Sequence, residues 1–106
     1  MDLLSTGDAL EAAKKFREAI AHDSNCFEAH HGLVRALRDA GRLEQSVAAA
    51  LALTVLTPDD PLAHTSLSIS LQHAGHIPEA EAAAAKARIL EWKLQLQSSL
   101  SVDSTK

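Results

Sequence analysis

Apolar residues recur along the chain at spacings of three and four, in segments that stop at glycine or proline. In the clearest segment they are Ala29, Leu33, Ala36, Leu37 and Ala40. This spacing places the side chains on one face of an α-helix. Applied to the whole chain, the pattern predicts five helices, at about residues 8–22, 27–40, 43–56, 61–74 and 77–97.

Glycines mark the expected turns between these helices. Gly7, Gly41 and Gly75 are separated by two equal steps of 34 residues. A helix commonly ends at a glycine, because glycine enters the left-handed region without a Cβ clash. We therefore expect a turn at each of the three, and Asp8 with Glu11 resembles a capping box that starts a helix after the first turn.

The 34-residue step extends beyond the glycines. Residues 27–60 aligned on residues 61–94 share ten identities, and residues 1–26 match more weakly. A period of this length indicates stacked helical units. We expect one domain over residues 1–97, made of a partial repeat (1–26), a repeat (27–60) and a repeat with an extended last helix (61–94), followed by a flexible tail at 98–106.

The repeated unit resembles the tetratricopeptide repeat family. On the first helix His30 and His64 stand at the large position, Leu33 and Leu67 at the leucine position, and Leu37 and Leu71 at the aromatic position; on the second, the small position is matched by Ala12, Ser46 and Ala80. Pro58 stands at the terminal proline. The resemblance implies an all-α fold, a right-handed superhelical stack of antiparallel helix–turn–helix repeats with a truncated first repeat.

The same resemblance implies a function in binding another polypeptide, a peptide or helix held on the concave face formed by the first helices. The implied groove residues are Glu28, His31, Arg35, Arg38, Asp39, Thr65, Ile69, Gln72 and His73. Arg35 and Arg38 lie one turn apart and are suited to gripping a carboxylate, although solvated charges are the simpler interpretation. The family's carboxylate clamp for chaperone tails is not expected, because its positions carry Gly32, Arg35 and Ser66.

Both ends of such a stack would leave apolar side chains uncovered. At the last helix these include Trp92 and Leu96, and near the truncated start they include Phe16 and Ile20. Open ends favour self-association, and we expect a homodimer through one of these two surfaces. Two alternatives stay open: a structural oligomerisation segment without a groove ligand, or a piece of a longer array.

Composition narrows the possible partners and the compartment. The formal net charge is -4, which provides no basic patch for nucleic acid. Cys26 is the single cysteine, so no internal disulfide is possible and a cytoplasmic setting is the default. The longest apolar run, at residues 47–56, is about half of what a bilayer span requires.

No residue pattern predicts catalysis, a metal or a cofactor. The six histidines include the candidates His30, His31, His64, His73 and His76, but none has the spacing of a zinc site. No nucleophile motif, phosphate loop or paired carboxylate lies on a recognisable turn. We therefore expect a protein that is not an enzyme.

Overall fold

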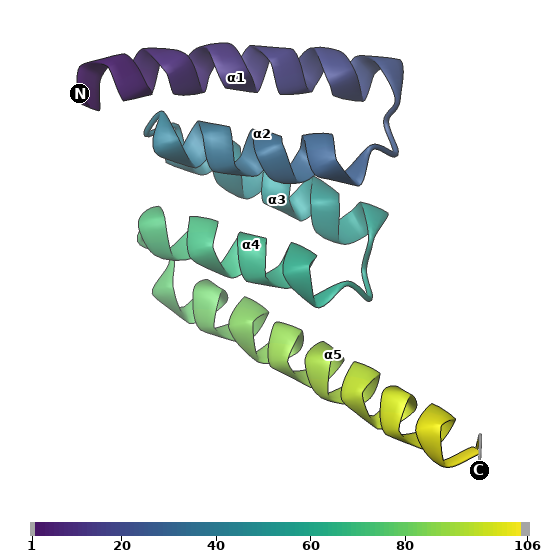
Figure 1. Ribbon diagram of the computed structural model, residues 1–106. Coiled ribbons are helices and arrows are strands. Elements are labelled where there is room, and N and C mark those ends of the chain that lie inside the picture. Colours follow the sequence, from purple (N-terminus) through teal and green to yellow (C-terminus); the bar gives the residue numbers. More distant parts are fainter. Residues whose placement is uncertain (1, 105–106) are drawn as a thin grey trace.

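The computed structural model describes the backbone of residues 2–104 and the side-chain surroundings of residues 7–99. Its helices are α1 (Asp2–His22), α2 (Phe27–Asp39), α3 (Leu43–Leu56), α4 (Pro61–His73) and α5 (Ile77–Ser104), shown in Figure 1. Each helix packs against the next, and α2 also contacts α4. No strand occurs between residues 2 and 104, and the predicted class, an all-helical stack of antiparallel hairpins, is confirmed.

The stack is elongated, with principal extents of 55 × 34 × 26 Å. Figure 1 shows the helices in a row, with α1 at one end, α5 at the other, and α3 behind α2. The contact between α2 and α4 places these two first helices on one side of the stack. This side is the inner face, and α1 and α5 form the two ends.

The turns after α2 and α4 confirm two of the three glycine predictions. Gly41 has a φ of 77° and Gly75 a φ of 87°. After α2, Arg42 N–H donates to the Leu37 carbonyl at 2.8 Å and Gly41 N–H to the Arg38 carbonyl at 3.0 Å. This is the hydrogen-bond pattern of a Schellman cap, which requires the left-handed residue.

The turn predicted at Gly7 is wrong. Helix α1 continues through Gly7, and a positive φ occurs in the described residues only at Gly41 and Gly75. Asp8 therefore lies inside a helix and starts none, so the predicted capping box with Glu11 is also absent. The physical reason is that, among the helices of residues 2–104, α1 packs only on α2. Continuing the helix costs about 1 kcal/mol for a glycine, whereas a turn would leave the first residues unsupported.

The last helix is longer than predicted. It ends at Ser104, where the pattern predicted about residue 97 and a flexible tail. Residues 98–104 are helical because no glycine or proline follows Pro78 to interrupt the backbone hydrogen bonds. Residues 105–106 of the predicted tail, and Met1 of the predicted leading helix, lie outside the described residues.

Histidine side chains anchor both loops that join one hairpin to the next. His30 Nε2 lies 2.8 Å from the Ser24 carbonyl, and His64 Nε2 lies 2.8 Å from the Pro58 carbonyl. The two pairs are related by the 34-residue period. Asp60 also caps α4, because its carboxylate accepts from the Leu62 N–H at 3.0 Å. The large position of the repeat thus holds the loop before its own helix.

Small residues let the two helices of each hairpin approach closely. In the α2–α3 hairpin, Ser46 Oγ donates to the Val34 carbonyl at 3.0 Å. In the α4–α5 hairpin the direction is reversed, and Ser68 Oγ donates to the Ala80 carbonyl at 2.8 Å. These are the same two positions of the repeat with the serine moved to the opposite helix. Each crossing therefore keeps one buried hydrogen bond between its helices.

Candidate interaction surface

Two polar contacts join α2 to α4 on the inner face. His31 Nδ1 lies 3.4 Å from Ser66 Oγ, and Arg38 Nη1 donates to Ser70 Oγ at 3.5 Å. Ser70 Oγ is in turn 2.7 Å from Ser46 Oγ of α3, where both hydroxyl groups are buried. His31 and Arg38 were predicted to face a ligand. Both side chains also take part in holding consecutive repeats together.

A hollow of about 310 Å³ lies between α1 and α2. We call it the N-terminal hollow, and it is lined by Ala9, Ala12, Phe16, Gly32, Arg35, Ala36 and Asp39. Its floor is apolar, since Ala9 and Ala36 are buried, and the two exposed charges stand at its edge. The surface is suited to an apolar helix or peptide that carries a polar group for the charged edge.

Phe16 forms the wall of the N-terminal hollow by lying against Gly32. A Cβ built at Gly32 would overlap three carbons of the Phe16 ring. Phe16 is half-buried and, like Ile20, packs on the core cluster of Ala13, Leu33, Ala36 and Leu37. The glycine is therefore needed at this position for the close approach of an aromatic ring, with no unusual φ.

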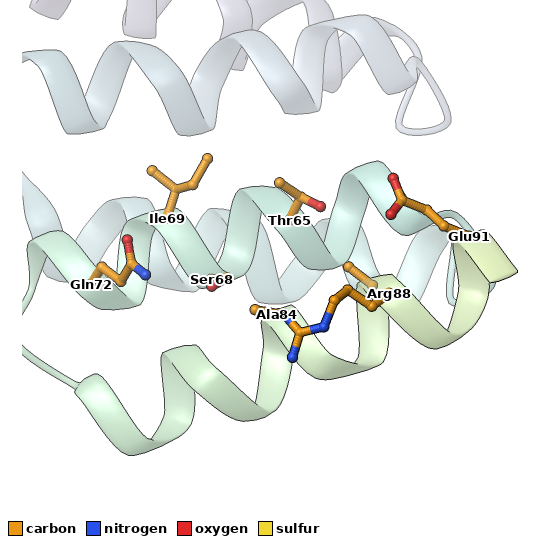
Figure 2. Close-up of a pocket in the computed structure, with 8 residues that line it drawn as sticks. Thr65, Ser68, Ile69, Gln72, Ala84, Arg88 and Glu91 are labelled. Carbon is orange, nitrogen blue, oxygen red and sulfur yellow. The ribbon is translucent and has the colours of Figure 1, made fainter.

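A second hollow, of about 200 Å³, lies between α4 and α5. We call it the C-terminal hollow; its lining is Thr65, Ser68, Ile69, Gln72, Ala84, Ala87, Arg88 and Glu91. Figure 2 shows Thr65, Ile69 and Gln72 on α4 above Ala84 and Arg88 on α5. Small side chains form much of its base on α5, and one cation and one anion are available there for a partner.

The C-terminal hollow repeats, one period later, a surface that is covered inside the stack. Its lining residues follow by 34 positions His31, Val34, Arg35, Arg38, Ala50, Leu53, Thr54 and Thr57. On that earlier surface α4 is seated, since Val34 and Ala50 form one core cluster with Leu67 and Leu71. The hollow therefore has the position of a seat for one further helix.

The N-terminal hollow obeys the same rule in the opposite direction. Its residues precede by 34 positions Leu43, Ser46, Ala50, Ser66, Ile69, Ser70 and His73. That later surface is covered by α2, whose Val34 carbonyl, His31 and Arg38 contact Ser46, Ser66 and Ser70. Both hollows thus occupy positions that hold a helix elsewhere in the same molecule.

The structure divides the predicted groove residues between these places. Arg35 and Asp39 line the N-terminal hollow, and Thr65, Ile69 and Gln72 line the C-terminal one. His31 and Arg38 bridge α2 to α4. Glu28 and His73 are exposed and line neither hollow, and His73 Nδ1 lies 2.9 Å from its own helix's Ile69 carbonyl. None of the hollows described here contains all of the predicted set.

The residues predicted for self-association differ in exposure. Trp92 is 61% exposed and Leu96 is 44% exposed on α5, beside Ile89 and Leu94. Phe16 and Ile20, in contrast, are partly buried against the core. The C-terminal half of α5 therefore offers more uncovered apolar surface than the face around Phe16.

Several histidines that had been considered as ligands are engaged singly. His30 and His64 hold loop carbonyls, and His76 Nε2 lies 2.9 Å from Glu44 Oε2. Within the described residues no group of three or more His, Cys, Asp or Glu side chains is placed to hold a metal. Among the same residues no helix has the length and hydropathy needed to cross a membrane.

Sequence reasoning missed the α5 side of the C-terminal hollow, which consists of Ala84, Ala87, Arg88 and Glu91. The prediction took groove residues from first helices alone, while each hollow is made by a first and a second helix together. The signal was present in the period, because Ala84 and Ala87 stand 34 residues after Ala50 and Leu53. Ala50 and Leu53 are fully buried, with 0% exposure, so the equivalent positions in α5 could have been expected to face a helix.

Comparisons with known proteins agree with this architecture. The solved structure described as MamA MSR-1 C2 superimposes with a TM-score of 0.76 at 19% identity, over 87% of this chain and 54% of that chain. This chain thus spans about half of the MamA chain, and at this identity the likeness concerns the fold. No curated protein matches the chain at a significant level.

The family comparison identifies the repeat itself. The family model described as tetratricopeptide repeat matches residues 3–69, more than half of the 106 residues. The match includes α1, α2 and α3 and extends into α4, in line with the period and hairpins described above. The chain belongs to the tetratricopeptide repeat family, whose members are modules for protein interaction.

Proposed function

We propose that the chain is a non-enzymatic adaptor or assembly module that binds a peptide or helix of another polypeptide on its inner face and associates with itself. One observation carries this proposal. Both end hollows occupy positions where, one period away in the same molecule, a helix is seated. A surface with this shape and this small-residue floor favours a helical ligand over an extended one.

The N-terminal hollow is the proposed site for another polypeptide. Its apolar base matches the apolar face of an amphipathic helix, and Arg35 at the edge offers a bidentate partner for a carboxylate. Asp39 lines the same hollow one turn further along, so a basic group next to the acidic one would be favoured. The proposed ligand therefore carries both signs of charge beside its apolar face.

The arginine pair from the sequence takes two separate roles in this proposal. Arg35 is exposed and lines the hollow, whereas Arg38 reaches Ser70 and is part-buried. Replacing Arg38 would disturb the contact between repeats, which makes it a poor probe of binding. Arg35 alone is the residue to substitute.

A second candidate function is a structural oligomerisation segment without a groove ligand. The observation that favours it is the exposed apolar surface of Trp92, Leu94 and Leu96, which lies outside both hollows. In this function the ends of the stack bind only copies of the chain. The cytoplasm is the proposed compartment in either case.

The experiment compares Arg35→Glu with Arg42→Glu, which makes the same charge change at an exposed position outside both hollows. The readouts are affinity capture of polypeptides from the native cell and sedimentation of the purified protein. We expect Arg35→Glu to reduce capture by about tenfold and Arg42→Glu to retain it. Capture that is equal for both variants would reject the groove and favour the second candidate.

A further inference from the structure

We infer that the C-terminal hollow is filled by α5 of a second copy of this chain, running antiparallel to the α5 that lines it. This inference rests on the proposed self-association and gives it a surface and a register. It depends on three features of α5. These are the seat that α5 forms with α4, the sequence of the C-terminal half of α5, and the charged pair Arg88 and Glu91, which lies between that seat and that half.

The register of the seat follows from the interior of the stack. The 2.7 Å contact between Ser46 and Ser70 aligns α3 with the antiparallel α4. Two turns further along, the same alignment places Leu53 opposite Ala63, and both have 0% exposure. One period later the positions of Ser46 and Leu53 are held by Ala80 and Ala87 of α5.

The C-terminal half of α5 repeats the sequence pattern of the helix seated in the interior. The spacing of Leu67, Ser70 and Leu71 in α4 recurs 29 residues later as Leu96, Ser99 and Leu100. In this alignment Trp92 corresponds to Ala63. The same chain therefore contains a seat and a segment with the leucine and serine pattern of an α4-like helix.

One large difference between the two helices, Ala63 in α4 against Trp92 in α5, is compensated in the seat. The interior register sets Leu53 opposite the small Ala63, whereas the seat has the smaller Ala87 where the incoming segment has Trp92. Compared with the interior pair, the seat has the smaller Ala87 in place of Leu53, and the incoming helix has the larger Trp92 in place of Ala63. Trp92 is 61% exposed in the single chain, so it is accessible for this contact.

The charges of the seat complement each other in the same register. Aligning Ala87 with Trp92 of the second copy, and Ala80 with its Ser99, sets Arg88 of each copy opposite Glu91 of the other. Both residues line the C-terminal hollow. Antiparallel pairing of identical helices is the arrangement that a two-fold axis produces, so the two contacts form together. This complementarity favours a second copy over an unrelated apolar helix.

Charge reversal tests this pairing. Arg88→Glu gives each copy two acidic residues at the contact, and Glu91→Arg gives each copy two basic ones. We expect either change to raise the dimer dissociation constant about tenfold or more, and the double variant Arg88→Glu/Glu91→Arg to restore it. A mixture of the two single variants should form heterodimers, because each then meets its opposite charge. Sedimentation velocity at several concentrations measures all four samples.

Cross-linking tests the register independently of charge. In a Cys26→Ser background, Ala84→Cys combined with Gln95→Cys should oxidise to a covalent dimer, because the proposed alignment sets these positions opposite each other. They are eleven residues apart on one helix, about 16 Å, so they cannot bond within a chain. The control pairs Ala84→Cys with Gln97→Cys, which should cross-link poorly.

Three results would overturn the inference: a monomeric wild type at all concentrations, a dimer that both charge reversals leave unchanged, or equal cross-linking of the control. These results leave the proposed function separately testable. Arg35→Glu is in the other hollow, so its effect on capture of another polypeptide does not depend on pairing through α5. Loss of dimerisation with intact, Arg35-dependent capture would reject this inference and keep the adaptor function.

Discussion

Gly32→Ala tests the close packing of α1 on α2, because the added Cβ atom has two opposing effects on stability. Alanine favours a helix by about 1 kcal/mol over glycine, which alone would stabilise α2. The added Cβ, however, would overlap three carbons of the Phe16 ring. Inserting a methyl group into packed surroundings costs about 1–3 kcal/mol. Since Phe16 is half-buried and can shift toward solvent, we expect a net destabilisation of about 1 kcal/mol.

A double-mutant cycle with Phe16→Ala tests this packing, because the stability change caused by Gly32→Ala should reverse its sign when the ring is absent. Without the ring, the Cβ at Gly32 meets no clash, and Gly32→Ala should stabilise the protein by up to about 1 kcal/mol. The coupling between the two sites is then about 2 kcal/mol. Urea unfolding of the four proteins, followed by circular dichroism, measures it. Stabilisation by Gly32→Ala in both backgrounds would refute the packing of Phe16 on Gly32.

Two further substitutions test the rest of the fold. Gly7→Ala should stabilise by up to about 1 kcal/mol in urea unfolding, because Gly7 is helical and a Cβ there meets no atom within 4 Å; destabilisation would instead indicate a turn. Ser46→Ala should destabilise by about 1–2 kcal/mol, since it removes the contacts to the Val34 carbonyl and Ser70. Exposed Ser98→Ala is its control, and equal effects of the two would contradict the buried network.

The three glycines show how far the sequence predicts this fold. Gly41 and Gly75 each follow a complete apolar helix pattern, so the period and the local sequence indicate the same turn, and both have positive φ. Gly7 falls at the same 34-residue spacing, but no complete apolar helix pattern stands before it in this sequence. A repeat period therefore predicts a position in the unit, but a turn also requires two helices that pack on each other.

The surfaces were less predictable than the helices because each is formed by two helices. In the sequence Arg35 and Arg38 are the same residue type, one helical turn apart. In the structure Arg38 reaches Ser70 across the inner face, while Arg35 lines a hollow. The end of α5 posed a different problem. No residue after Pro78 is a helix breaker, so only the absence of a stop signal indicated the additional turns.

Fluorescence of Trp92 measures the central claim most directly, that the exposed end of the stack is covered by another helix. Trp92 is the only tryptophan, and it is 61% exposed in the single chain. Burial against Ala87 of a second copy should move its emission to shorter wavelengths as concentration rises, and Glu91→Arg should abolish that shift. An emission maximum that stays constant from dilute to concentrated protein would contradict the account.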